Sequence, residues 1–432
     1  MFKKRAISSL LLAVSFIFTF IGCGLFYLTQ NVSQPFSKVD PLFILISLLA
    51  FYMMYVGFFN GKKDLNVLID KVTEVVFDNC VVQMILIFLL SGVFGSITSN
   101  IGSSQSLTNF LLNLLPANAI LLGVFISSAA IATAMGTSLS TVAIMGPVAL
   151  SLQNVASPIY LASAVISGAY FGDNVSLISD TTIAAANVTG SDIIKKFKLN
   201  FKLSIFPFFM VCVIMLLQGQ NSNEVVTMNN FNILLIMPYI LVVVLGMCNI
   251  NVISVLLIGI LNATMLALFR GMSLTNLSVF STQGLLSLAE LNTFVILISF
   301  LSTMIKIEGG FEIIEYKISQ YFDNKSSNRL AVILVFIILL INNLIMANNT
   351  IAIILTGALI KKIFDTAKTP THVAGAITDN FSCGVHGLLP HAPQVLLAAS
   401  IFNIGIFEVV RHSYYCIFLT TTTFIYFMFK KH

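Results

Sequence analysis

Two aspartates and a run of hydroxyl side chains stand together in the segment SGAYFGDNVSLISDTT, residues 167–182. Carboxylate and hydroxyl oxygens are the ligands that sodium and other hard cations prefer. A carboxyl group can hold either a proton or a sodium ion, so the segment predicts a site where the two compete. The alternative is that the first aspartate is a turn residue and the second caps a helix at a loop surface. The candidate ligands are Asp173, Asp180, Ser176, Ser179, Thr181 and Thr182.

A second polar cluster follows in TDNFSCGVHGLLPHAPQ, residues 378–394. Asp379 and Asn380 open it, and His386 and His391 lie on either side of Pro390. Imidazole titrates near neutral pH, so the histidines could contact a solute or carry a proton. They could equally be structural hydrogen-bond donors. We expect a substrate site or a second ion site here.

Short polar sequences interrupt two long apolar runs. Gly136, Thr137, Ser138 and Ser140 interrupt residues 118–152, and the sequence Asn348, Asn349, Thr350 interrupts residues 329–362. Glycine weakens a helix, and short hydroxyl and amide side chains compete for backbone hydrogen bonds. We therefore expect broken helices whose free carbonyls and hydroxyls complete the cation cage. A small-residue helix-packing face is the alternative.

The surrounding chain has the composition of an integral membrane protein. Of its 432 residues, 57% are hydrophobic and only 9% charged, and the mean hydropathy is +0.97. Soluble domains carry roughly 25% charged residues. The six cysteines show no spacing typical of metal ligands, and the net charge of +5 comes without a basic stripe. We therefore expect a single membrane domain in the lipid bilayer, without cofactor or nucleic-acid partner.

Ten membrane crossings are predicted from runs long enough to span about 30 Å of hydrocarbon. Because cytoplasmic loops collect Lys and Arg, we place both termini in the cytoplasm, which puts 16 of the 22 basic residues there, including Lys195, Lys196, Lys198 and Lys202. Lys361 and Lys362 oppose this orientation. The runs are 6–28, 41–59, 80–98, 118–152, 200–218, 230–247, 251–269, 291–305, 329–362 and 413–429.

The two halves of the chain match when one is shifted by 211 positions. MGTSLSTVAIMGP, which starts at Met135, then lies over MANNTIAIILTGA, which starts at Met346. Five crossings per half is an odd number, so the halves should be inverted, as in alternating-access transporters with a site at the repeat interface. We predict repeats at 1–219 and 220–432, each with a broken helix and a re-entrant hairpin, at about 157–190 and 370–403. Gly136, Gly172, Gly384 and Pro390 are the expected hinges and turns.

ATAMGTSLSTVAIMGP and SGAYFGDNVSLISDTT resemble the GTSWGT-like and SGAYFGDKxSPLSDTT segments of the NhaC-type sodium/proton antiporter family. The resemblance extends along the chain in length and segment order. It implies the ion-transporter fold, an all-α polytopic protein of two inverted five-span repeats, and cation-coupled secondary transport. The positions it carries over are Thr137, Ser138, Gly172, Asp173, Ser176, Ser179, Asp180, Thr181 and Thr182.

The chain also departs from that family. Leu139 and Ser140 replace Trp-Gly, Asn174 replaces a lysine, and Leu177 and Ile178 replace Pro-Leu. GVHGLLPHAPQ is similar to GLIPYGAQ-type segments of a branch associated with sodium-coupled uptake of amino acids or other organic solutes. Such symport is therefore the alternative to exchange of sodium for protons across the cell (inner) membrane by an elevator-like movement.

Two other classes of protein fit the sequence less well, and two charged stretches form a further candidate surface. An intramembrane aspartyl protease would need Gly-x-Gly-Asp, and Phe171 interrupts that pattern. A passive channel would not need two copies of a discontinuous site. The stretches 63–79 and 308–323 carry charges on one face and read as interfacial helices, whose apolar faces could meet a second subunit in a homodimer.

Overall fold

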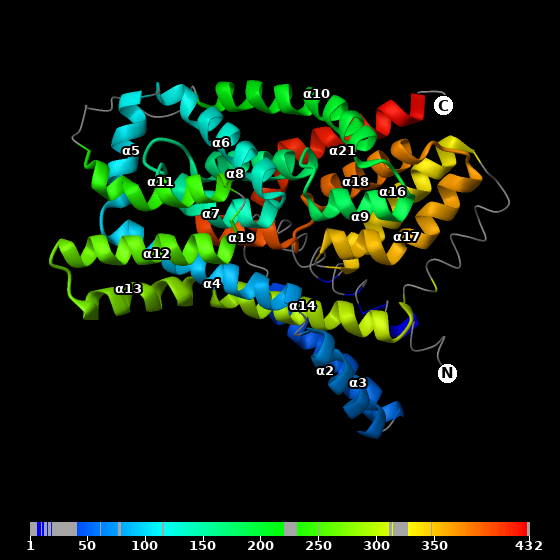
Figure 1. The fold of residues 1–432 in the computed structure, drawn as a ribbon. Coiled ribbons are helices and arrows are strands. Elements are labelled where there is room, and N and C mark those ends of the chain that lie inside the picture. The colour runs from blue at the N-terminus through cyan, green and yellow to red at the C-terminus, as the bar shows by residue number, and fades with distance from the viewer. Residues whose placement is uncertain are drawn as a thin grey trace, which may run out of the picture.

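All regular structure in the described part of the chain is helical (Figure 1). In this computed structural model the described residues are 7–9, 11, 12, 15, 19, 41–60, 62–76, 79–114, 116–219, 231–248, 250–310, 313, 327–346 and 348–429. Most of the predicted span 6–28 and of the stretch 308–323, and the expected connection between the halves near residues 220–230, lie outside them. Within them the all-α prediction is confirmed.

Four of the described helical stretches are long and apolar enough to cross a membrane. They are Val81–Asn100, Ile193–Gly219, Val252–Phe269 and Leu274–Ile307. Large apolar side chains remain exposed on such helices, for example Phe206 and Phe209 on α10 (Ile193–Gly219). Because lipid is the solvent that favours such surfaces, the protein is a multi-pass membrane protein.

Other predicted spans correspond to α2 (Pro41–Asn60), α4 (Asn79–Asn100), α11 (Ile233–Met247), α14 (Ala289–Ile307) and α21 (Tyr414–Phe429). Three further helices, α5 (Ser103–Leu114), α13 (Leu274–Ser287) and the six-residue α20 (Ile406–Arg411), were not predicted. The unpredicted α13 packs beside α4 and α12 (Val252–Phe269). A close approach at Gly92 and Gly284 allows this, since a Cβ on Gly92 would lie 2.3 Å from the Gly284 carbonyl oxygen.

Both predicted helix breaks are present. α6 (Ile120–Met135) ends at Gly136, whose φ of 67° is left-handed, and α7 starts at the second residue beyond it (Ser138–Leu150). Glycine adopts this conformation without the steric penalty of a Cβ. In the other half α16 (Asn328–Ile345) ends before Asn348, whose Oδ1 accepts a hydrogen bond from the Ile351 N–H at 3.0 Å and so caps α17 (Asn349–Thr366).

Two-helix hairpins occupy both predicted segments, although their turns differ from the prediction and their re-entry into the membrane stays a prediction. The first is α8 (Pro158–Asn174) and α9 (Asp180–Thr189), and the second is α18 (Thr371–His386) and α19 (Pro393–Phe402). Gly172 and Gly384 lie inside α8 and α18, so the prediction that they lie at turns was wrong, while their role as hinges stays a prediction. Both permit close helix packing instead: a Cβ would lie 2.3 Å from the Ala129 oxygen on α6, or 2.2 Å from Thr420 Oγ1 on α21. Pro390 does lie in the turn between α18 and α19.

The helix starts follow the predicted repeat spacing. α2 and α12 start 211 residues apart (252 minus 41), as do α7 and α17 (349 minus 138). The packing is reciprocal, because α9 of the first half lies against α17 and α19 of the second half lies against α7 (Figure 1). This arrangement brings each hairpin to the broken helix of the other half. The division at residue 219 and the inversion of the halves stay predictions.

Candidate functional site

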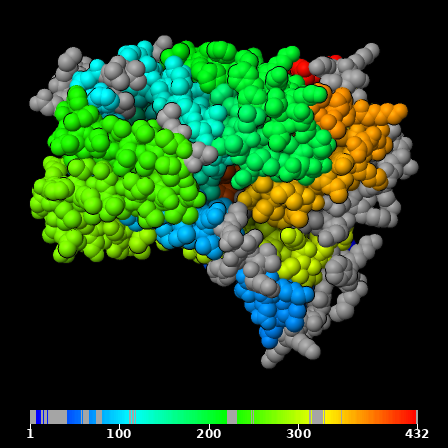
Figure 2. Space-filling model, in the orientation of Figure 1, coloured from blue at the N-terminus to red at the C-terminus, as the bar shows by residue number. Residues whose placement is uncertain are grey.

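A cavity of about 300 Å³ lies where the two broken helices meet the two hairpins. Gln83 of α4 lines it, as do Thr137 at the first break and Asp180 of α9. Asn349 lines it from the second break. Figure 2 shows the corresponding face hollowed near its centre, between blue, green and orange parts of the chain. Both halves therefore build one site.

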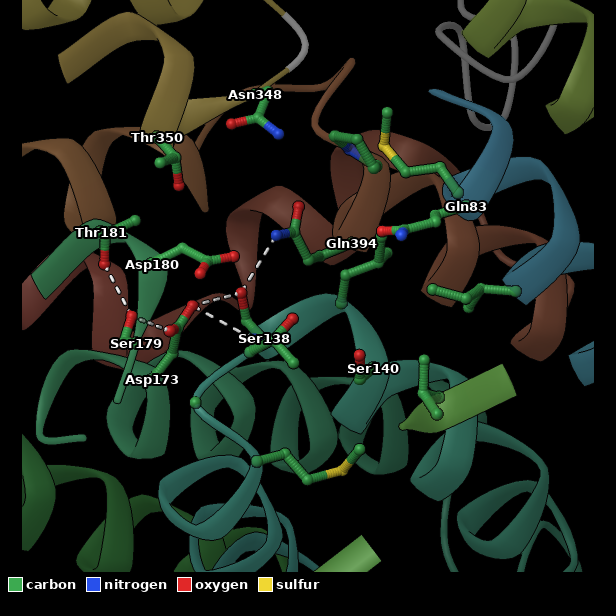
Figure 3. Close-up of a pocket in the computed structure, with 18 of the residues that line it drawn as sticks. Gln83, Ser138, Ser140, Asp173, Ser179, Asp180, Thr181, Asn348, Thr350 and Gln394 are labelled. Carbon is green, nitrogen blue, oxygen red and sulfur yellow. Dashed lines mark hydrogen bonds between the residues drawn. The ribbon is translucent and has the colours of Figure 1, made fainter. Parts of the chain in front are cut away.

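Asp173 is the most deeply held acid of the cavity wall. Its side chain is 4% exposed, and its Oδ2 accepts hydrogen bonds from the Ser138 N–H at 3.2 Å and the Ser138 Oγ–H at 2.7 Å. Its Oδ1 accepts one from the Ser179 hydroxyl at 2.6 Å, and Ser179 Oγ lies 2.9 Å from Thr181 Oγ1 (Figure 3). α8 therefore presents a carboxylate to the first turn of α7, where the helix dipole favours negative charge, and to the start of α9.

Asp180 and Thr137 complete this wall of the cavity without joining the hydrogen bonds of Asp173. Asp180 is the first residue of α9 and is exposed toward the cavity. Asp173, Asp180, Ser179 and Thr181 therefore come together as the sequence predicted. They offer a cation one hydrogen-bonded carboxylate, a second carboxylate that is open to the cavity, and hydroxyl oxygens. This set of ligand atoms suits an alkali cation.

Two predicted ligands point away from the cavity. Ser176 donates to the Thr133 carbonyl oxygen of α6 at 2.8 Å, which pins the α8–α9 turn. Thr182 donates to Asp379 Oδ2 at 3.0 Å, on the opposite side of α9 from the cavity. Among the described residues no three His, Cys, Asp or Glu side chains are grouped as transition-metal ligands would be.

Gln394 joins the second half to Asp173 and was not predicted. Its Nε2 donates to Ser138 Oγ at 3.0 Å (Figure 3), and its Oε1 lies 3.2 Å from His386 Nε2. The chain from His386 through Gln394 and Ser138 to Asp173 is therefore continuous and buried. The sequence signal for Gln394 was its place in the first turn of a short apolar helix behind Pro393.

Other predicted residues of the second half have separate places. Asn348, Asn349 and Thr350 line the cavity opposite Asp173. The buried Nδ2 of Asn349 has no partner within the described structure. His391 Nε2 lies 3.2 Å from the Asn343 carbonyl oxygen and does not line the cavity, which suits a structural role. Neither side-chain polar atom of Asn380 is hydrogen-bonded to the residues described.

Asp379 belongs to a second buried cluster. Its Oδ2 forms an ion pair with Lys196 Nζ and accepts a hydrogen bond from Asn200 Nδ2 at 2.8 Å. Lys196 is fully buried, so the prediction that it is one of the loop cations that orient the chain was wrong. The signal was the spacing: Lys196 and Asn200 are four residues apart and share one face of α10.

Comparison with known proteins gives a family. The sequence model described as the Na+/H+ antiporter family matches residues 4–220. The "Na(+)/H(+) antiporter NhaC" of Bacillus subtilis (strain 168) is 27% identical over 242 residues, which are 52% of each chain. The "Malate-2H(+)/Na(+)-lactate antiporter" of the same organism is 26% identical over 193 residues, 40% of this chain and 41% of that one. The matches thus span about half the length of these curated relatives or less.

A second NhaC, from Alkalihalophilus pseudofirmus (strain ATCC BAA-2126 / JCM 17055 / OF4), is 25% identical over 203 residues, 44% of each chain. A solved structure titled for Neisseria gonorrhoeae MtrF and a class of antimetabolite efflux pumps superposes with a TM-score of 0.41 and 12% identity. That superposition covers 85% of this chain and 84% of the other.

Proposed function

Because the chain belongs to the Na+/H+ antiporter family, we propose that it exchanges sodium ions for protons across the cell membrane, with Asp173 as the shared binding group. The observation that carries this proposal is the setting of Asp173: a buried carboxylate at a helix break, held by hydroxyl groups, on the wall of a cavity built by both halves.

The hydroxyl groups around Asp173 suit two states of the carboxyl. A serine hydroxyl is both donor and acceptor, and its hydrogen rotates to suit its partner. With no ion bound, Ser138 and Ser179 donate to the carboxylate, as the structure shows. With sodium bound, the same hydroxyls turn their oxygens toward the ion. With a proton bound, the carboxyl donates to one of them and offers no charge to sodium.

Exchange follows from this exclusion. A buried site that holds one positive charge at a time binds either sodium or a proton. If it opens to the two sides of the membrane in turn, it releases sodium on one side and returns with a proton. The hairpin and the break that hold Asp173 come from the first half, whereas Gln394 and Asn349 come from the second. A rigid movement of one set against the other, elevator-like, would change which side the cavity faces. Both termini are expected in the cytoplasm.

The test is sodium-driven proton flux in proteoliposomes that contain no organic solute. Asp173→Asn keeps the shape of the side chain but cannot carry charge, so we expect its flux to fall to that of empty liposomes. Asp192→Asn is the matched control, since Asp192 is exposed and lies outside the cavity. An Asp173→Asn protein that exchanges at the wild-type rate would exclude this site.

A second candidate function is sodium-coupled transport of an organic carboxylate or amino acid. The cavity of about 300 Å³ is about ten times the roughly 30 Å³ of one water molecule, and Met84, Ile87 and Val252 give it an apolar side. The Nδ2 of Asn349, which has no partner among the described residues, offers a donor to a carboxylate. One relative is itself named for malate and lactate.

The same vesicles separate the two candidates. Labelled lactate, malate and a panel of amino acids are added under a sodium gradient. Proton flux without any solute favours ion exchange alone. Uptake that requires both the gradient and one of the solutes favours the coupled carrier, with Asn349→Ala expected to weaken uptake of that solute and to spare sodium binding.

A further inference from the structure

The ion pair between Lys196 and Asp379 joins the two halves of the protein. Lys196 lies in the first two turns of α10, and Asp379 lies in the middle of α18, 183 residues away. Both side chains are 0% exposed. Taking two charges out of solvent is expensive and is compensated only when the geometry is good and further hydrogen bonds satisfy the groups. A full lysine charge at this place therefore needs an explanation.

The burial is selective within one helix. Lys195 and Lys198 lie on either side of Lys196 in α10, and both are exposed. A lysine that served only to orient the chain would lie on that exposed face. Only the face that carries Lys196 and Asn200 turns toward α9 and α18. The ammonium is therefore directed at Asp379 by the helix itself.

The groups around Asp379 are rich in oxygen. Thr182 and Asn200 both donate to Asp379 Oδ2, and the side chain of Asn200 also reaches the Asn174 carbonyl oxygen at 3.5 Å. Three buried side-chain oxygens of this cluster have no hydrogen-bond donor within the described structure: Asp379 Oδ1, Asn200 Oδ1 and Asn174 Oδ1. Buried acceptors without donors destabilise a fold. A surplus of carboxylate, amide and hydroxyl oxygens is the ligand set of a hard cation.

This cluster is adjacent to the Asp173 site through α9. Thr181 lies 2.9 Å from Ser179 on the cavity side, whereas the next residue, Thr182, donates to Asp379 on the other side. One short helix therefore carries hydroxyls for two acids. Neither Lys196 nor Asp379 lines the cavity.

We propose that the cluster around Asp379 is a second alkali-cation site whose resident cation is the Lys196 ammonium. The tethered ammonium compensates the Asp379 carboxylate throughout the cycle and cannot be released. Sodium is then exchanged at one site per chain, at Asp173. This last statement rests on the proposed function, whereas the oxygen cage around Asp379 does not.

Equilibrium binding of ²²Na+ to the purified full-length protein tests the proposal. The wild-type protein is expected to bind one sodium ion per chain, lost in Asp173→Asn. Lys196→Met removes the ammonium at similar length and is expected to raise binding to two ions per chain. Lys196→Met combined with Asp379→Asn returns it to one, and the exposed-lysine control Lys198→Met leaves it at one.

The outcomes are distinct. Two sodium ions on the wild-type chain would overturn the proposal, because the ammonium would then not fill the second site; this measurement needs no variant to fold. One ion on both the wild type and Lys196→Met would overturn it while leaving the Asp173 site intact. If the wild type binds no ion, Lys196→Met binds one and the double variant with Asp379→Asn binds none, the second site is supported and the first is refuted. If Lys196→Met accumulates only when sodium is supplied, and the double variant accumulates without it, the proposal is supported as well.

Discussion

Gly172→Ala tests whether the packing of α8 against α6 sets the position of Asp173. A Cβ on Gly172 would lie 2.3 Å from the Ala129 carbonyl oxygen, 2.5 Å from Ala132 Cβ and 2.6 Å from the Thr133 nitrogen. Such contacts below 3.0 Å essentially never occur, so the helices must separate by at least 0.7 Å (3.0 minus 2.3). Two of the three contacts are with backbone, which no side-chain rotation relieves.

The displacement acts directly on the carboxylate, because Asp173 is the next residue of α8. If the 2.7 Å bond from Ser138 Oγ to Asp173 Oδ2 lengthens by the same 0.7 Å, it exceeds the roughly 3.0 Å limit of a good O–H···O bond. In the sodium-bound state the same hydroxyl turns its oxygen to the ion, so the displacement also removes a ligand of sodium. A polar contact to a charged group contributes about 1.5–3 kcal/mol. Because 1.4 kcal/mol is tenfold in an equilibrium constant, we expect sodium affinity to weaken about 10- to 100-fold, along with a loss of stability of about 1–3 kcal/mol from overpacking.

The assay is the sodium concentration that gives half-maximal proton flux in proteoliposomes, with thermal unfolding of the purified protein measured in parallel. Gly405→Ala is the control, since its nearest neighbour to a new Cβ is 3.9 Å away and its φ of −62° suits alanine. Wild-type sodium dependence and wild-type stability in Gly172→Ala would refute the claim that this close approach positions the site.

Two further predictions concern the supports of the same site. Gly136→Ala and Gly190→Ala both force alanine to a φ near +67°, which costs about 1–2 kcal/mol. Only the new Cβ at position 136 also meets the α8–α9 turn, at 2.9 Å, so we expect a larger drop in unfolding temperature for Gly136→Ala. Equal drops would show that the break does not contact the turn. Tyr415→Phe removes the hydroxyl that accepts a hydrogen bond from Asn174 and donates one to Ser204, both at 3.0 Å. We expect chemical unfolding to show a loss of stability of about 1–3 kcal/mol, with sodium binding at Asp173 retained. A loss below about 0.5 kcal/mol would mean that the buried amide of Asn174 finds another partner.

Much of the site could be predicted from local sequence. The breaks depend on residues whose own chemistry ends or caps a helix, as Gly136 does with its left-handed φ and Asn348 with its side-chain cap. Asp173 was identifiable because an acid is rare in so apolar a chain. Its bond to Ser179 joins residues six positions apart in one motif. These features are set within a few residues of the chain, whereas the bond to Ser138 spans 35 positions and needs the packing of α8 against α7.

The tertiary structure alone decided which polar side chains face one another. Helical periodicity places Lys196 and Asn200 on one face of α10, but nothing local says that this face meets α18 while Lys195 and Lys198 stay exposed. The contact of Gln394 with Ser138 joins residues 256 positions apart. Composition and periodicity determined a helical membrane protein with interrupted spans, because each helix must satisfy its own backbone in lipid. Partners across the chain depend on how the helices pack, and packing is a property of the whole fold.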